Sequence, residues 1–169
     1  NPDLTSIYNV PLYLNKQKFG EKIIQKLCLK KKTIVPGLSK WKHFEKSHQK
    51  AKNPLKIAVV GKYFATGSNK LTDSYVSVIE ALKQSSWIQG FDPQFSWINC
   101  EDLENNSVSL SGFQGIVVPQ GWGSRGVEGK LLAAKYAREN KIPYLGLCFG
   151  MQMATIEFAR NVLKLTGAN

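Results

Sequence analysis

One five-residue segment constrains the fold of this chain more than any other. Residues 146–150 read Gly-Leu-Cys-Phe-Gly, and they stand between a short apolar run at 142–147 and a helical pattern of apolar residues from Met153 onwards. This spacing between a buried strand and a helix is typical of a nucleophile elbow, a tight turn with small residues two positions either side of its centre. The segment therefore predicts a strand that ends in a strained turn and continues directly into a helix.

The alternation of strand and helix patterns extends back to residue 56. Short apolar runs suited to buried parallel strands lie at 57–61, 94–99, 115–118 and 142–147. A helical pattern at 127–140 separates the last two of these runs. Because parallel strands are joined by crossover helices, the chain is expected to be α/β, with a mostly parallel sheet of four or more strands flanked by helices.

Three segments follow these strands and are expected to meet at one edge of the sheet. They are Gly61, the glycine-containing loop 120–123, and Cys148. Ligand sites of parallel sheets lie beyond the carboxyl ends of the strands. The sequence therefore predicts a site at this edge.

Cys148 is the candidate nucleophile of that site. The turn would place its sulfur at the N-terminus of a helix, where the helix dipole favours the reactive thiolate. The N–H of Phe149 can then point at the oxygen of an attacked carbonyl, and loop 119–123 can supply a second donor. The alternative is a small buried cysteine between two packing glycines.

Residues 1–55 differ from the rest in composition. They hold 12 Lys and three acidic residues, a net charge of +9 out of +11 for the whole chain, whereas 56–169 carry only +2. Helical patterns near 20–29 and at 39–50, the second with Ser39 as N-cap, precede a boundary at Asn53-Pro54. A solvated Lys-rich surface is favoured over a nucleic-acid site, because the segment has no Arg and no series of stacking aromatics.

Several classes of protein are excluded by composition. No apolar run approaches membrane-spanning length, and the N-terminus lacks the pattern of a signal peptide. The three cysteines Cys28, Cys100 and Cys148 are too widely spaced for a zinc motif, and an odd number argues against a secreted disulfide framework. We therefore expect a cytoplasmic protein with no metal site.

His43 and His48 both lie in the basic segment, so no base for Cys148 is evident.

The chain resembles the CTP synthase family over nearly its whole length. The likeness is carried by the elbow with Met151-Gln152 and by the runs at 6–12, 60–63, 73–82, 125–130, 136–143 and 156–163. The resemblance implies a flavodoxin-like class I glutamine amidotransferase domain at 56–169, preceded at 1–55 by the end of a synthetase domain and a connector. In that family the glutaminase releases ammonia from L-glutamine, and the synthetase domain uses ATP and Mg to aminate UTP in pyrimidine biosynthesis.

The resemblance also implies residue roles and partners. Cys148 is the nucleophile, the N–H groups of Gly121 and Phe149 bind the oxyanion, and Trp122 and Gln152 line the glutamine pocket. No cofactor is expected in this chain, since ATP and Mg belong to the synthetase domain. GTP as effector and a homotetramer are expected for the complete protein, and neither membrane nor nucleic acid is expected as a partner.

Two departures from the family pattern matter. Residues 119–123 read Pro-Gln-Gly-Trp-Gly where the family usually has Pro-Gly-Gly-Phe-Gly, so Gln120 would be strained if its position required a positive φ, and would then weaken the oxyanion site. The sequence also ends at Asn169, before the family's catalytic His and Glu. We therefore expect little glutaminase activity from this chain alone, and exposed apolar surface around Met151, Phe158 and Leu163.

Two other functions remain open at this stage. The chain could be a non-catalytic assembly or binding module with a vestigial cysteine, or another class I cysteine hydrolase of the same fold. Turnover of glutamine with and without UTP and ATP would separate these alternatives.

Overall fold

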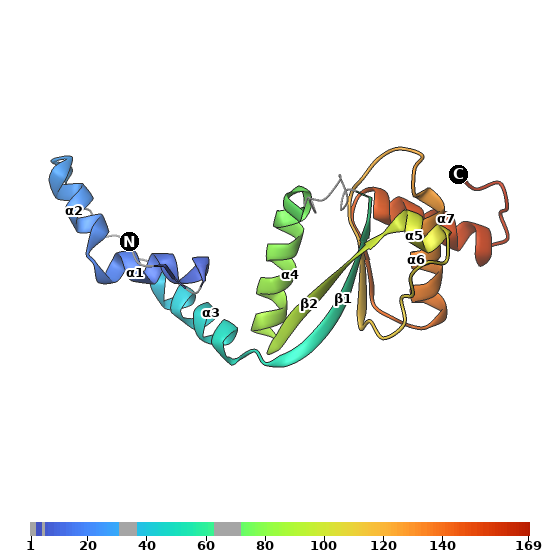
Figure 1. Ribbon diagram of the computed structural model, residues 1–169. Helices are drawn as coiled ribbons and strands as arrows, with labels where there is room; N and C mark the ends of the chain where they lie inside the picture. The colour runs from blue at the N-terminus through green and yellow to red at the C-terminus, as the bar shows by residue number, and fades with distance from the viewer. Residues whose placement is uncertain (1–2, 5, 31–36, 63–71) are drawn as a thin grey trace.

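Four parallel strands form one sheet in the order β2-β1-β3-β4, of which Figure 1 labels β1 and β2. The computed structural model describes residues 3–4, 6–30, 37–62 and 72–169. The strands are β1 (Asn53–Gly61), β2 (Phe91–Asn99), β3 (Gly115–Val118) and β4 (Tyr144–Gly146). The expected α/β fold with a parallel sheet is confirmed.

β1 occupies the middle of the sheet because it is apolar on both faces. Ala58, Val59 and Val60 are completely buried. β1 pairs with β2 from Asn53 to Gly61, and its inner part pairs with β3. The strand is longer than the apolar run predicted, because its first residues pair with β2 even though most of them are exposed.

β4 is shorter than the apolar run at 142–147 suggested. The N–H of Ile142 is bound by the carbonyl of Ala137 at the end of the preceding helix, 2.9 Å away. Pro143 has no N–H to give to a ladder. Regular pairing therefore begins only at Tyr144, opposite Ile116.

Helices cover both faces of the sheet (Figure 1). They are η2 (Thr72–Tyr75), α4 (Val76–Ile88), α5 (Cys100–Glu104), α6 (Val127–Glu139) and α7 (Phe149–Asn161). Ala58 and Val60 share one core cluster with Cys100, Leu103, Ala133 and Ala137 of α5 and α6. Val59 points to the other face, where it packs with Tyr75 and Ile79. The alternation along β1 thus gives each layer its own core.

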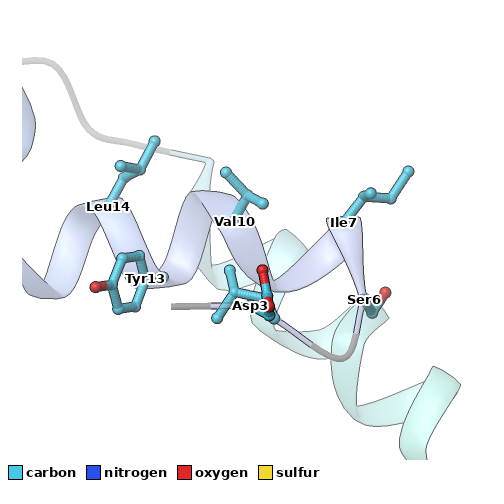
Figure 2. Close-up of a pocket in the computed structure, with 7 residues that line it drawn as sticks. Asp3, Ser6, Ile7, Val10, Tyr13 and Leu14 are labelled. Atoms are coloured by element: carbon cyan, nitrogen blue, oxygen red, sulfur yellow. The ribbon is translucent and has the colours of Figure 1, made fainter. Parts of the chain in front are cut away.

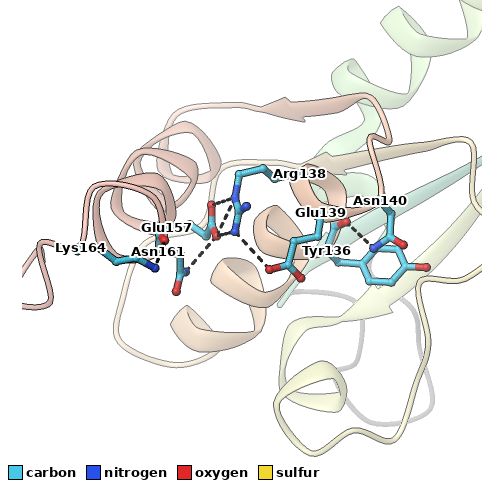
Figure 3. Close-up of polar contacts among 7 residues, drawn as sticks. All are labelled: Tyr136, Arg138, Glu139, Asn140, Glu157, Asn161 and Lys164. Carbon is cyan, nitrogen blue, oxygen red and sulfur yellow. Dashed lines mark hydrogen bonds and ion pairs between the residues drawn. The ribbon is translucent and has the colours of Figure 1, made fainter.

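A partly buried ion pair joins α6 to α7 (Figure 3). Glu157 is nearly inaccessible, and both of its oxygens accept hydrogen bonds from Arg138, the shortest being 2.7 Å from Nη2. The Nδ2 of Asn161 donates to the same carboxylate at 3.0 Å. The hydrogen bond to Glu157 raises the pKa of Arg138. This pairing helps to fix the direction of α7, the helix that directly follows Cys148.

The basic segment is helical and packs against α4. It contains η1 (Ile7–Asn9), α1 (Val10–Lys16), α2 (Phe19–Lys26) and α3 (Leu38–Lys50). The two expected helices are confirmed, but Ser39 is not the N-cap: α3 begins after Gly37, and no side-chain cap is formed among its described residues. An aromatic cluster of Tyr8, Trp41, Phe44, His48 and Trp87 joins the segment to the end of α4.

Apolar residues of α7 and the segment after it remain exposed. Met151, Phe158 and Leu163 have exposed fractions of 56%, 47% and 57%. The exposure expected from the sequence at these three positions is therefore confirmed.

Candidate active site

Cys148 forms a strained turn between β4 and α7. Its φ of 53° and ψ of −109° lie outside the regions that residues with a side chain normally occupy. The turn is fixed by two hydrogen bonds of 3.0 Å, from the N–H of Leu147 to the carbonyl of Val118 and from the N–H of Gly150 to the carbonyl of Leu147. Cys148 itself is exposed. The strained strand-to-helix turn predicted from the sequence is confirmed.

Two glycines allow this turn because neighbouring backbone leaves no room for a side chain. A Cβ on Gly146 would lie 2.6 Å from the carbonyl carbon of Gly150. A Cβ on Gly150 would lie 1.9 Å from the carbonyl oxygen of Val118. The spacing of the motif therefore follows from the close approach of β4, α7 and β3.

The start of α7 presents a free donor beside the sulfur. Phe149 is the first residue of the helix, so its N–H has no acceptor within the helix. The N–H groups of Met151 and Gln152 are bound by the carbonyl of Cys148. The Tyr144 hydroxyl donates to the carbonyl of Gly150 at 2.8 Å, and burial raises the pKa of Tyr144. Cys148 and the Phe149 N–H thus stand at the positive end of a 13-residue helix.

Loop 119–123 follows β3 and takes its unusual backbone angles at glycines. Gly121 has a φ of 155° and Gly123 a φ of 106°, whereas Gln120 is not among the residues with positive φ. The expectation that Gln120 would be strained by a positive φ is therefore wrong, because the neighbouring glycines adopt the conformations that a side chain would resist.

Three side chains hold the carbonyls of this loop. The Tyr75 hydroxyl donates to the carbonyl of Gln120 at 3.0 Å, and the Lys130 Nζ donates to that of Gly121 at 2.8 Å. The Lys62 Nζ donates to the carbonyl of Trp122. The sequence predicts no role for these three residues, because a Lys or Tyr within a strand or helix pattern does not show which loop its side chain reaches.

Lys130 also contacts the start of α7. Its Nζ lies 4.7 Å from the centroid of the Phe149 ring, and the residue is completely buried. Burial lowers the pKa of Lys130, the Cys100 thiol opposes that shift, and Lys62 adds to it.

A cavity of about 640 Å³ opens at Cys148. Its lining is made by Ser74, Tyr75, Gln120, Gly121, Trp122 and Cys148. The rings of Trp122 and Phe149 pack together with centroids 5.3 Å apart. Gln152 does not line this cavity; with Phe149 it lines another, of about 550 Å³, along α7. The structure therefore brings four of the five predicted site residues to the Cys148 cavity or its border, and places Gln152 beside Phe149.

The other candidate groups lie elsewhere. The two histidines are on α3, and the ring of His48 packs 3.9 Å from that of Trp87, next to the amino ends of the strands. A cavity of about 270 Å³ in the basic segment is lined by Asp3, Leu4, Ser6, Ile7, Val10, Tyr13 and Leu14 (Figure 2), at the opposite end of the molecule from α7 (Figure 1).

Two other kinds of feature are absent from the described part of the chain. Within it, no three His, Cys, Asp or Glu side chains gather closely enough to hold a metal ion. None of its helices combines the length and apolar character needed to cross a bilayer.

Comparison with known proteins gives a consistent set of relatives. The model of the family "Glutamine amidotransferase class-I" matches residues 70–168. A CTP synthase from a Cyanothece species is 46% identical over 169 residues, which are 99% of this chain and 30% of that protein. The CTP synthase of Bacillus subtilis is 41% identical over 169 residues, with the same coverage of both chains. The chain thus spans about 30% of the length of these curated relatives.

A solved structure is also similar. A Trypanosoma brucei CTPS glutaminase domain with bound acivicin superimposes with a TM-score of 0.58 and 37% sequence identity. The match covers 66% of this chain and 43% of the trypanosomal one.

Proposed function

Because this chain belongs to the class-I glutamine amidotransferase family, we propose that Cys148 is the nucleophile of a glutaminase site. The observation that carries the proposal is the strained turn at Cys148, which lies at a cavity of about 640 Å³. The backbone around this turn leaves room only for glycine at positions 146 and 150. A residue held in such a conformation at the edge of a cavity is a candidate for function, because the fold must offset its strain.

The reaction proceeds through a thioester. The thiolate of Cys148 attacks the side-chain amide carbon of L-glutamine, and the carbonyl oxygen becomes an oxyanion in a tetrahedral intermediate. The C–N bond then breaks, the nitrogen takes a proton and leaves as ammonia, and a γ-glutamyl thioester remains. Water attacks this thioester, which releases glutamate and regenerates the thiol.

The oxyanion is bound by the N–H groups of Gly121 and Phe149. Gly121 lines the cavity, and Phe149 begins the helix whose dipole favours negative charge there. Loss of one such donor typically costs about 3–4 kcal/mol of transition-state stabilisation. Trp122 forms a wall of the glutamine pocket. Gln152 lines the neighbouring cavity beside Phe149 and not the Cys148 cavity, and its role as a substrate-binding residue is proposed from the family resemblance alone.

The general base comes from another part of the complete protein. Both histidines of this chain lie on α3, where His48 packs against Trp87, and neither lines the Cys148 cavity. We therefore expect this chain alone to hydrolyse glutamine poorly, even though the nucleophile and oxyanion donors are present.

In the complete protein, the ammonia aminates UTP to CTP at a separate synthetase site that uses ATP and Mg. This step is proposed from the CTP synthase relatives, of whose length the chain spans about 30%. GTP as effector, a homotetrameric assembly and a cytoplasmic location are proposed on the same ground. Residues 1–55 then form the end of the synthetase domain and the connector.

Cys148→Ser in the full-length protein tests the function. Glutamine hydrolysis should fall by about 10³-fold or more, whereas CTP formation from added ammonia should stay within about twofold, because that reaction bypasses the thiol. A wild-type protein that makes CTP from ammonia but not from glutamine would instead support a vestigial cysteine. Glutamine hydrolysis that does not respond to UTP and ATP would support another cysteine hydrolase.

A further inference from the structure

Loop 119–123 is held by side chains from three different elements. Tyr75 ends η2, Lys130 lies within α6, and Lys62 directly follows β1. Between them they bind the carbonyls of three consecutive residues, Gln120, Gly121 and Trp122. Gly121 is the most permissive of these residues, so its conformation depends strongly on external support.

A held carbonyl fixes the direction of the N–H in the same peptide group. The C=O and N–H of a trans peptide are coplanar and point in opposite directions. The Gln120 carbonyl and the Gly121 N–H belong to one such group. The hydroxyl of Tyr75, 3.0 Å from that carbonyl, therefore determines where the proposed oxyanion donor points. Tyr75 is only 1% exposed, which leaves its ring little freedom to move.

Lys130 connects the two halves of the proposed oxyanion site. Its Nζ donates to the carbonyl of Gly121 at 2.8 Å and lies 4.7 Å from the centroid of the Phe149 ring. The side chain is completely buried. Burying an amine is costly, and an apolar residue of similar volume is often as stable or more so. The contacts of Lys130 thus indicate a role other than stability.

We propose that Tyr75 and Lys130 are positioning residues of the oxyanion site. Tyr75 directs the Gly121 N–H, and Lys130 keeps the Gly121 peptide in a fixed place relative to Phe149. Both donors are then arranged before glutamine binds, so no binding energy is used to order the loop. This inference rests on the proposed glutaminase function.

Tyr75→Phe and Lys130→Met in the full-length protein test the proposal. Each removes one hydrogen-bond donor with little change in volume. We expect kcat for glutamine hydrolysis to fall by about 10–100-fold with KM within about threefold, since the lost interaction acts mainly in the transition state. Tyr136→Phe is the matched control, because Tyr136 lines a different cavity together with Leu103 and Leu110. This control variant should hydrolyse glutamine like the wild type.

Two readouts separate positioning from general damage. Alkylation of Cys148 by iodoacetamide forms no oxyanion, so its rate should stay within about twofold in both variants. The melting temperature of Lys130→Met should equal or exceed that of the wild type, because the variant no longer buries an amine. Ammonia-dependent CTP formation should also persist.

Unchanged kcat in both variants would overturn the proposal. So would a fall in kcat matched by an equal fall in the iodoacetamide rate, because the effect would then lie on the thiol and not on the oxyanion donors. If Cys148→Ser hydrolysed glutamine as fast as the wild type, the proposed function would fail first, and the positioning role with it.

Discussion

The elbow at 146–150 and loop 119–123 both follow a strand of the same sheet, yet they are held by different means. The elbow is held by main-chain contacts: Gly146 and Gly150 admit the close backbone of α7 and β3, and the turn at Cys148 is closed by main-chain hydrogen bonds of Leu147 and Gly150. The loop is held by Tyr75, Lys130 and Lys62, which are 45, 9 and 60 positions away in the sequence. One half of the site is thus held by contacts between backbone groups, and the other half by side chains from distant elements.

This difference decides how each half responds to substitution. A change inside the elbow meets backbone atoms that cannot move without displacing a strand. A change inside the loop meets side-chain ends, which can adjust. We therefore expect substitutions at the elbow glycines to change activity and stability most. Substitutions at loop positions with an ordinary backbone conformation should change them least.

Gly150→Ala is the most severe test of the elbow. Its Cβ would lie 1.9 Å from the carbonyl oxygen of Val118, so α7 would have to shift away from β3. We expect glutamine turnover to fall by about 10³-fold and the free energy of unfolding to drop by about 3 kcal/mol, the upper range for overpacking. Gly20→Ala is the control, because nothing lies within 4 Å of its Cβ. An active Gly150→Ala protein would show that the elbow does not depend on close backbone approach.

A pair of substitutions at Cys148 measures the strain itself. Cys148→Gly and Cys148→Ala both remove the thiol, so neither should hydrolyse glutamine. At a φ of 53° and ψ of −109°, Ala keeps the strained Cβ and Gly does not. Cys148→Gly should therefore be more stable than Cys148→Ala by about 1–3 kcal/mol, the usual range for such backbone strain. Denaturant unfolding of the two variants gives this difference, and Ala equal to Gly would refute a strained turn.

The elbow and the sheet could be predicted from the sequence because their determinants are adjacent in the chain. Short apolar runs predicted β1 and β3, and the Gly-x-Cys-x-Gly spacing predicted the turn and the start of α7. The prediction of Ser39 as N-cap of α3 is wrong, because the N-cap is Gly37, and a serine two residues further along looks equally suitable in sequence.

The support of loop 119–123 could not be predicted in the same way. Lys130 lies in a helical pattern, and nothing in that pattern shows that its amine turns inward to the carbonyl of Gly121. Likewise, Gln120 avoids a positive φ because Gly121 and Gly123 adopt the positive φ angles of the loop. Contacts between distant residues decide both features, and a single sequence does not record them.

Lys130 gives a pH-dependent test of how side chains hold loop 119–123. Because its pKa is lowered in the folded protein, the unfolded chain binds more protons between that pKa and the ordinary value of about 10.4. The free energy of unfolding therefore rises with pH in this range. Above the ordinary pKa the buried amine is neutral and carries no penalty, and below the lowered pKa the full penalty for burying the charged amine applies. Lys130→Met should melt above the wild type at pH 7, and the difference should shrink as the pH rises to 10. A difference that grows with pH would mean that the amine is not penalised by burial.

Gln120→Gly should have the smallest effect of all. Its carbonyl is bound by Tyr75 through the backbone, which glycine retains, and its φ is already one that any residue adopts. We expect glutamine turnover to change by less than about threefold, and stability to fall by about 0.5–1 kcal/mol from the added freedom of the unfolded chain. Steady-state kinetics and denaturant unfolding of the full-length protein measure both quantities.

Gly123→Ala is the matched contrast within the same loop. Gly123 has a φ of 106°, and a Cβ there would lie 3.1 Å from the Lys62 Nζ that holds the Trp122 carbonyl. This variant should lose more turnover than Gln120→Gly, because it strains the backbone and crowds a supporting side chain together. A tenfold or larger gain from Gln120→Gly would show that position 120 does limit the oxyanion site, and the loop would then depend on its own residues as the elbow does.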